Sequence, residues 1–210
     1  MSQVVLLKPE NDANQTSLKE DMFRFRHKIF YERMGWEVPS INGMEQDEFD
    51  KENPVYVISR NEEHHVEGCW RLLPTTGPNM LRDIFPQLLG DAEVPCSPTE
   101  WEISRLAVSP GSQERMSTQL HRITSQMLRT LFDFAEANGI ERFVFVTSVT
   151  LERLIRRLGF TLHRFSEPQQ VGKVMSVACW LDVNSESRQL IDACYGRNAK
   201  EEALSDDQFR

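Results

Sequence analysis

The feature that most constrains the fold of this chain is a long helical pattern followed directly by a short, continuously apolar segment. Apolar residues recur at helical spacing from Leu120 to Phe134, and the pattern stops at Asn138 and Gly139, where a helix typically ends. The next segment, Phe143–Val146, is apolar at every position, which is typical of a central strand covered on both faces. A helix next to such a strand predicts a sheet with helices packed against it.

Further helices and strands are predicted on both sides of this unit. Ser17 and Glu20 match a capping box ahead of an apolar stripe, which predicts an amphipathic helix that ends at Gly35. The segments interpreted as strands are 55–59, 66–73, 101–108, 142–149, 160–165 and 174–183, and helices are predicted over 151–158 and 186–195. Helices before, between and after strands predict an α/β fold, namely a three-layer α/β/α sandwich with a mixed central sheet. The pattern leaves the order of the strands open.

Size and charge limit what the chain can be. Its 210 residues are 40% apolar and 27% charged, so we predict a single domain over residues 1–198 and a polar tail over 199–210. The formal net charge of −8 argues against binding of nucleic acid through the overall field of the protein.

Neither a membrane segment nor a metal site is predicted. No apolar run reaches the roughly 18–20 residues of a membrane-spanning helix, and the N-terminal segment lacks the features of a signal peptide, so a cytoplasmic protein is expected. The four cysteines are far apart and have no histidine at ligand spacing. They are expected to be small, mostly buried thiols and to form neither a disulfide framework nor a zinc site.

The residues that could carry chemistry fall in three short segments. Glu102-Ile103-Ser104-Arg105 places a carboxylate, a hydroxyl and a guanidinium on one strand, and such a carboxylate can serve as a general base. Asp47-Glu48-Phe49-Asp50 is strongly acidic but lacks the residue order of a calcium loop. Arg26 and Phe30 share a helix face, and Trp36 follows. Taken singly, these segments also fit an exposed ion pair, a solvated acidic surface and a core aromatic residue.

Taken together and in this order, with the segment Gly68-Cys69-Trp70-Arg71, they make the sequence resemble the acyl-homoserine-lactone synthase family, the autoinducer synthases of bacterial quorum sensing. The resemblance is at motif level over roughly residues 26–105 and continues more loosely to about residue 180. The positions that carry it are Arg26, Phe30, Trp36, Asp47, Asp50, Arg71, Phe85, Glu102 and Arg105. It implies a fold similar to the GCN5-related N-acyltransferases. It also implies acylation of the α-amine of S-adenosylmethionine by an acyl thioester, followed by lactonisation that releases methylthioadenosine.

The residue chemistry agrees with this implied reaction. Asp47 and Asp50 suit the cationic groups of S-adenosylmethionine, while Phe30 and Trp36 can form an aromatic wall near the sulfonium. The arginines can bind the substrate carboxylate or order the two acids, and the residues alone leave open which arginine does which. Phe85 belongs to the same implied substrate site.

Glu102 is the candidate general base, with Ser104 and Arg105 beside it as further candidate catalytic residues. Glu102 and Arg105 are three residues apart, so a regular strand would point their side chains to opposite faces. Either a β-bulge brings them to one face, or they act on different sides of the sheet.

The acyl donor is predicted to be an acyl carrier protein rather than coenzyme A. Residues 109–116 lack the glycine-rich turn with which acetyltransferases of the wider fold bind the pyrophosphate of coenzyme A. A basic cluster of Arg153, Arg156 and Arg157 is a candidate docking face for an acidic carrier protein, the alternative being an ordinary solvated helix face.

The acyl chain itself leaves a weaker trace in the sequence. Thr147 lies where relatives that accept a chain oxidised at the third carbon commonly have Thr, which favours a 3-oxo or 3-hydroxy acyl group. Met127, Phe145 and Val149 are candidate acyl-chain residues, although the same residues also fit an ordinary core. No cofactor is expected, because S-adenosylmethionine is a substrate.

Two other functions remain open from the residues. A related acyltransferase that uses coenzyme A thioesters and a different amine would keep Glu102 but would not require Asp47, Asp50 and Trp36 together. The second alternative is an inactive scaffold or a small-molecule-binding regulator. Release of methylthioadenosine would distinguish the synthase from both.

Overall fold

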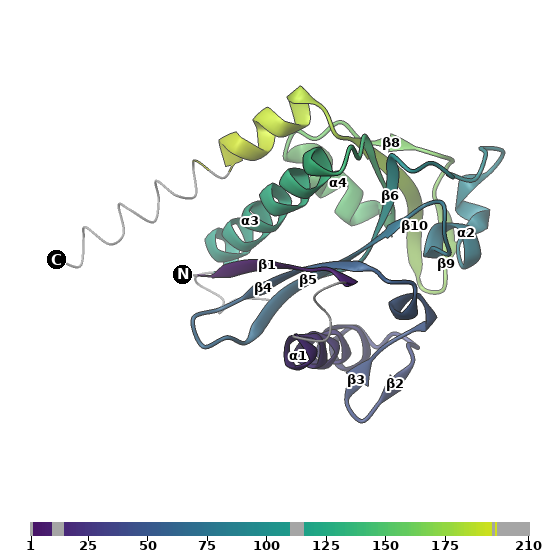
Figure 1. Cartoon of the computed structure of the whole chain (residues 1–210). Coiled ribbons are helices and arrows are strands. Elements are labelled where there is room, and N and C mark those ends of the chain that lie inside the picture. Colours follow the sequence, from purple (N-terminus) through teal and green to yellow (C-terminus); the bar gives the residue numbers. More distant parts are fainter. Residues whose placement is uncertain (1, 10–14, 110–115, 195, 197–210) are drawn as a thin grey trace.

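The computed structural model describes residues 2–9, 15–109, 116–194 and 196, with the backbone alone over 116–121. Its centre is an eight-stranded sheet in the order β1-β4-β5-β6-β7-β10-β8, with β9 beside β10 (Figure 1). Neighbouring strands are antiparallel except β6 and β7, which run parallel. The predicted mixed sheet and α/β class are therefore confirmed.

The elements have the following bounds. The strands of the sheet are β1 (Gln3–Leu7), β4 (Val55–Arg60), β5 (Val66–Pro74), β6 (Glu100–Val108), β7 (Arg142–Ser148), β8 (His163–Arg164), β9 (Gln169–Val171) and β10 (Val174–Asp182). A separate hairpin consists of β2 (Ser40–Ile41) and β3 (Met44–Glu45). The helices are α1 (Thr16–Arg26), the π-helix η2 (His27–Arg33), the 3-10 helices η3 (Glu48–Lys51) and η4 (Pro86–Leu89), α2 (Met80–Asp83), α3 (Met116–Ala137), α4 (Val149–Arg157) and a helix over residues 185–194.

Alternation along the strands sorts side chains between the two faces of the sheet. On β5, Trp70 and Leu72 join the larger apolar core, which also takes in α3, α4 and the helix over residues 185–194. The neighbouring residues Cys69 and Arg71 face the opposite way, toward α1. Helices cover both faces, so the three-layer arrangement is confirmed (Figure 1).

The sheet separates between its two parallel strands. β6 and β7 are paired only at their first residues, Glu100–Glu102 with Arg142–Val144. Beyond this point β7 continues beside β10, whereas β6 continues beside β5. The strands therefore diverge, and a gap in the hydrogen-bond ladder opens at the centre of the sheet.

The first helix differs from the prediction at both ends. Its N-cap is Gln15 and no side chain caps it, so the predicted capping box of Ser17 and Glu20 is wrong. The helix is also not α-helical throughout, because it widens into the π-helix η2 and ends before Gly35, whose φ of 63° favours glycine. The approximate extent of this helix was predictable from the sequence, but its change to a π-helix was not.

Other boundaries also differ from the prediction. Val149 begins α4 instead of ending β7, because the hydroxyl of Ser148 accepts the Leu151 amide and starts a helix there. Only His163 and Arg164 of the segment 160–165 pair as a strand, since Phe160 and Leu162 pack into the core as irregular chain. Two of the cysteines, Cys69 and Cys179, are buried as expected, whereas Cys96 is exposed.

Some predictions concern residues outside the described parts of the chain. These are the polar tail over 199–210 and most of the segment 109–116. The single domain over 1–198 stays a prediction. Among the helices that the structure describes, none is both long and apolar enough to cross a membrane.

Candidate active site

Six buried charged side chains form a closed ring in which positive and negative groups alternate. Arg26 on α1 donates to Glu45 at 2.5 Å and to both oxygens of Asp50 at 2.8 and 3.0 Å. Arg105 on β6 donates to Glu45 at 2.9 Å and to Asp47 at 2.6 Å. The order around this charge ring is Arg26, Glu45, Arg105, Asp47, Arg71 and Asp50.

Arg71 closes the ring from β5. Its Nη1 donates to Asp47 and, at 3.0 Å, to Asp50, while its Nε donates to the hydroxyl of Ser104 at 3.1 Å. Its Nη2 is buried and has no hydrogen-bond partner among the described residues. One donor atom of the ring is therefore left without an acceptor among the described residues.

The spacing of the two aspartates follows from a helix start. Asp47 is the N-cap of η3, and its amide donates to Oδ2 of Asp50 at 2.8 Å. The hydroxyl of Tyr56 donates to the other oxygen of Asp50 at 2.8 Å. These contacts fix the carboxylate of Asp50, so Arg26 and Arg71 meet an acceptor that is already oriented.

The ring stays ionised although it is buried. Burial by itself raises the pKa of the Asp50 carboxyl, but Arg26 and Arg71 outweigh it and hold that pKa well below its usual range. Glu45 behaves in the same way, because Arg26 and Arg105 lower the pKa of its carboxyl against the effect of burial. Three positive and three negative charges thus compensate one another.

A β-bulge brings Arg105 and Glu102 to the same face of the sheet. Arg71 pairs with Ser104 and Cys69 with Ala107, so β6 has one more residue than β5 over this stretch. Arg105 occupies the left-handed region with a φ of 53°, which is uncommon for a residue other than glycine. Of the two arrangements that the sequence left open, the bulge is therefore the correct one.

Glu102 lies beside the charge ring and is 1% exposed. Its two carboxylate oxygens accept the backbone amides of Met80 at 3.0 Å and Leu81 at 2.6 Å. Burial raises the pKa of its carboxyl, although these two amide contacts and the nearby Arg71 and Arg105 act in the opposite direction. A carboxylate whose proton affinity is raised by burial is suited to accept a proton.

Aromatic rings border the charge ring on the side of η2. Phe30 and Trp36 stack at 5.1 Å between ring centroids, and the guanidinium of Arg105 lies 5.7 Å from the centroid of Phe30. Phe30 is buried, but Trp36 is 40% exposed. A cation can bind on such a ring face, and the role of these two rings as an aromatic wall for the substrate stays a prediction.

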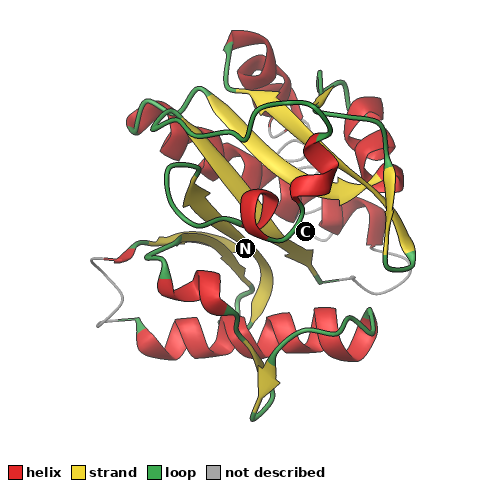
Figure 2. Ribbon diagram, turned by 90° about the vertical axis from the view of Figure 1, so that its right-hand side faces the viewer, coloured by secondary structure: helices red, strands yellow, loops and turns green. Residues whose placement is uncertain are grey.

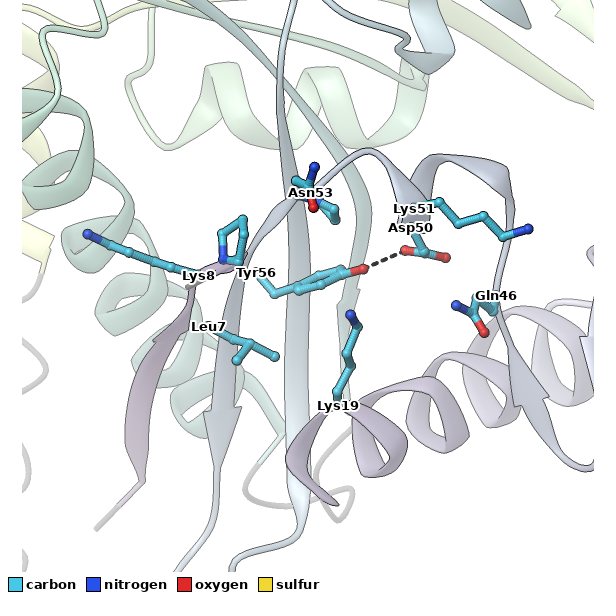
Figure 3. A pocket seen from close by; sticks show the side chains of 10 residues that line it. Leu7, Lys8, Lys19, Gln46, Asp50, Lys51, Asn53 and Tyr56 are labelled. Carbon is cyan, nitrogen blue, oxygen red and sulfur yellow. Dashed lines mark hydrogen bonds between the residues drawn. The ribbon is translucent and has the colours of Figure 1, made fainter. Parts of the chain in front are cut away.

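The charge ring also reaches a surface pocket. Asp50 lines a pocket of about 280 Å³ together with Tyr56, Lys19 and Gln46, and Figure 3 shows the Tyr56 hydroxyl pointing at Asp50. Within the described part of the chain, none of the three ring arginines lines it. Away from this pocket, the charge ring lies against α1 and the hairpin β2–β3. This hairpin projects past α1 in Figure 2.

The other predicted residues lie outside the ring. Phe85 packs with the apolar residues between η4 and the sheet. Met127 and Phe145 belong to the core on the α3 side, where Thr147 is 7% exposed and, as a cross-strand partner of Val177, faces the same way. Val149 opens α4.

The three arginines of α4 do not share one environment. Arg156 donates to Glu152 at 2.9 Å, and Arg164 on β8 donates to the same buried carboxylate. Arg153 and Arg157 are exposed on the same helix. All three arginines are exposed, but Arg156 is paired with Glu152 while Arg153 and Arg157 form no ion pair within the described chain.

Sequence reasoning missed several members of the site. Glu45 is 0% exposed and joins two ring arginines, yet a single glutamate in an acidic stretch carries no signal of its own. The Met80 and Leu81 amides are backbone groups, which a side-chain motif cannot reveal. Tyr56 could have been suspected only from its place on a buried strand next to Asp50.

The fold is similar to that of an N-acetyltransferase. A solved structure of a putative N-acetyltransferase from Lactobacillus plantarum superposes with a TM-score of 0.54 at 13% identity, covering 87% of this chain and 99% of that one, which is a likeness of fold alone. The expected resemblance to the acyltransferase fold is therefore confirmed.

Closer comparisons identify the family. The family model described as autoinducer synthase matches residues 10–191. An acyl-homoserine-lactone synthase of Pseudomonas aeruginosa is 36% identical over 187 residues, which are 88% of this chain and 90% of that protein. The chain belongs to the autoinducer synthase family, and it is an acyltransferase.

Two solved structures of this family match over nearly the whole chain. The crystal structure of the acyl-homoserine-lactone synthase LasI has a TM-score of 0.81 at 33% identity, covering 91% of this chain and 94% of that one. The coenzyme A-dependent synthase BjaI, solved with S-adenosylmethionine and isopentyl-coenzyme A, has a TM-score of 0.82 at 25% identity, covering 95% and 90%. The family thus includes at least one coenzyme A-dependent member.

Proposed function

We propose that the protein makes an acyl-homoserine lactone from S-adenosylmethionine and an acyl group carried by acyl carrier protein. The observation that carries this proposal is the juxtaposition of the charge ring, the Phe30–Trp36 stack and Glu102 on one face of the sheet. The substrate has a sulfonium, an α-amine and a carboxylate, and the site offers aromatic faces, carboxylates and arginine donors within a short distance.

The charge ring indicates how the arginines divide their work. Arg26 has all of its recorded hydrogen bonds with Glu45 and Asp50, so it orders the acids. The Nη2 of Arg71 has no partner among the described residues, which makes it the best placed donor for the substrate carboxylate. Arg105 lies under Phe30 and near Glu102, where it balances the charge that collects around the amine.

The first step forms an amide. Glu102 accepts a proton from the α-ammonium group, whose pKa in model compounds is about 7.7–8.0, and the free amine attacks the thioester carbonyl. The amide bond forms as the carbon–sulfur bond of the thioester breaks and the thiol leaves. Ser104 contributes by holding Arg71 through its hydroxyl.

The second step forms the lactone. The carboxylate oxygen attacks the γ-carbon, and the bond to the positively charged sulfur breaks, so methylthioadenosine leaves as a neutral molecule. The protein needs to supply only the alignment of the reacting atoms, and no cofactor takes part.

The acyl chain passes through the sheet where β6 and β7 diverge. Glu102 faces α2, whereas Thr147 and Phe145 face α3, so a chain attached at Glu102 reaches Thr147 only by crossing the sheet. The ladder between β6 and β7 ends at Glu102 and Val144, so a chain that crosses beyond this point separates no paired backbone groups. Phe145 and Met127 lie in the core on the far side of the sheet, Val149 begins α4 two residues after Thr147, and the Thr147 hydroxyl forms no hydrogen bond within the described chain. It therefore suits an oxygen on the third acyl carbon.

A carrier protein fits the surface at α4. Arg153 and Arg157 are exposed there, next to the exposed apolar side chains of Leu151 and Leu154. An acidic protein that also presents apolar residues would bury both kinds of side chain. Arg156 contributes less to this surface because Glu152 already neutralises it.

The proposal is tested first in a heterologous bacterial culture that expresses the chain. Mass spectrometry of an organic extract identifies any acyl-homoserine lactone and its acyl chain, and methylthioadenosine is assayed in parallel. If folded protein yields neither the lactone nor methylthioadenosine, the proposed reaction is contradicted.

The donor is then tested with purified protein. We expect R153E to raise the KM for acyl carrier protein without lowering kcat, and to leave the KM for S-adenosylmethionine unchanged. The matched control is R24E, which reverses one exposed arginine on α1, across the sheet. If R153E, R24E and wild type have the same KM for acyl carrier protein, α4 is not the docking face. If the enzyme turns over with acyl-coenzyme A but not with acyl carrier protein, coenzyme A is the donor.

A further inference from the structure

The short helix α2 begins directly at the carboxylate of Glu102. The amide of Met80 donates to Oε2 at 3.0 Å and the amide of Leu81 donates to Oε1 at 2.6 Å. Each carboxylate oxygen thus accepts one backbone hydrogen bond, and the two bonds fix the orientation of the Glu102 side chain. The thioether sulfur of Met80 also lies 3.2 Å from Nη1 of Arg105, so Met80 contacts both Glu102 and Arg105.

Asn79 determines where these two amides lie. Its Oδ1 accepts the Arg82 amide at 3.0 Å and caps α2, while its Nδ2 donates to the carbonyls of Gly77 at 3.0 Å and Thr75 at 3.4 Å. Asn79 is 2% exposed, whereas most asparagine side chains in turns are exposed to solvent. One side chain therefore joins the end of the preceding loop to the first turn of α2.

The loop itself is attached to β6. The hydroxyl of Thr75 donates to the carbonyls of Ser97 and Glu100 and accepts the Ser97 amide. Because Glu100 lies two residues before Glu102 on the same strand, the loop, α2 and β6 form one hydrogen-bonded unit. The Met80 and Leu81 amides are fixed relative to the strand that carries Glu102.

We propose that Asn79 is a positioning residue for Glu102, which acts by holding the Met80 and Leu81 amides against the carboxylate. This inference rests on the proposed role of Glu102 as the general base. Asn79 and Met80 are not among the family motif residues of the sequence. Neither side chain needs to touch the substrate for this role.

The amides have a definite chemical effect. A hydrogen bond from an N–H group stabilises the ionised carboxylate and not the protonated acid. Burial acts in the opposite direction on Glu102, because a carboxylate with 1% exposure has lost its water. The two amides therefore keep Glu102 ionised, and able to accept a proton, at a pH where burial alone would leave it protonated.

One substitution removes a single donor. Met80 is the first residue of α2, and proline is tolerated at this position because it needs no amide hydrogen there. The preceding residue, Asn79, is already extended with φ −153° and ψ 159°, as a residue before proline must be. M80P deletes the N–H that binds Oε2 of Glu102, and M80A is the matched control that removes the thioether but keeps the N–H.

The readout is the pH profile of kcat/KM for methylthioadenosine release, measured with S-adenosylmethionine and the acyl donor that wild type uses. One hydrogen bond to a charged group corresponds to about one pKa unit, so the acid limb of M80P should move up by about one pH unit relative to M80A. At a pH on that limb M80P should be about tenfold slower than M80A, while the two agree within about twofold on the plateau.

Asn79 is tested in the same assay. N79A should move the limb in the same direction as M80P, and N79S, which retains an acceptor for the Arg82 amide, should lie between N79A and wild type. The control is N184A, because Asn184 caps the helix over residues 185–194 through the same Oδ1 contact, with the Ser187 amide at 3.0 Å. N184A should leave the limb unchanged, and if M80P does not fold, N79A and N79S decide the question.

The two possible failures are distinguishable. Equal limbs for M80P and M80A, or for N79A and N184A, would overturn the positioning role and leave Glu102 as the base. Wild-type turnover and an unchanged limb in E102Q would overturn the base assignment, and the positioning role with it.

Discussion

The charge ring predicts a large and specific loss of stability when one carboxylate loses its charge. Glu45→Gln keeps the shape of the side chain but leaves Arg26 and Arg105 with one negative group fewer, so the ring changes from three against three to three against two. Both arginines lie almost entirely out of water, and water cannot replace the missing charge. Removal of one partner of a buried ion pair typically costs about 3–5 kcal/mol.

The expected size is therefore a loss of about 3–5 kcal/mol in the free energy of unfolding, or roughly 6–20 °C in Tm for a domain of this length. Urea unfolding at pH 7 measures it, with the m-value as a check that the same surface unfolds. Glu20→Gln is the matched control, because Glu20 pairs with Arg24 at 3.3 Å on the exposed side of α1. Its loss should stay below about 1 kcal/mol.

A loss below about 1 kcal/mol for E45Q, or a loss equal to that of E20Q, would refute the reasoning. It would mean that solvent reaches Arg26 or Arg105, or that the ring rearranges at little cost. Salt gives a second check, since only the exposed pair should weaken appreciably between low and high ionic strength.

Three further predictions follow from the ring and its surroundings. The pKa values of the Glu45 and Asp50 carboxyls are lowered in the folded protein. The stability that these two ionised carboxylates contribute is therefore complete above about pH 5 and is lost as the pH falls below about 4. The urea midpoint should fall between pH 7 and pH 3, and it should fall less steeply for E45Q. Burial raises the pKa of the Cys69 thiol to about 12, so a thiol reagent at pH 8 should modify the exposed Cys96 within minutes and Cys69 only in urea; rapid labelling of Cys69 in folded C96S protein would contradict this. Arg105 has a φ of 53°, so R105G should be more stable than R105A by about 1 kcal/mol although both lose the guanidinium, and the reverse order in thermal melts would show that the bulge does not persist without the ring.

The general fold was predictable because its signals are local. The stripe that ends at Asn138 and the apolar run Phe143–Val146 both depend on neighbours a few residues away, and both became the expected elements, α3 and β7. The short pieces were not predictable in the same way. The hairpin β2–β3, η3 and α2 have two to four residues each, and their conformations depend on contacts with distant parts of the chain.

The site shows the same division. Its motif residues could be selected by their types and order, and most of them do meet in the charge ring. Glu45 could not be selected, because its importance comes from Arg26 and Arg105, which are 19 and 60 residues away in the chain. The donors to Glu102 are backbone amides, whose direction depends on the turn made at Asn79.

The layers, the family and the set of charges available for the site could all be predicted from the sequence. These follow from residue types and their spacing, since burial periodicity and motif order are properties of the chain. How the charges pair, and that Glu102 and Arg105 share one face, became clear only from the folded structure. That choice depends on one extra residue in β6, whose left-handed backbone is uncommon for arginine and is held in place by Glu45 and Asp47 from another part of the chain. A local pattern cannot show such a conformation, because the contacts that stabilise it form only when the sheet, α1 and the hairpin come together.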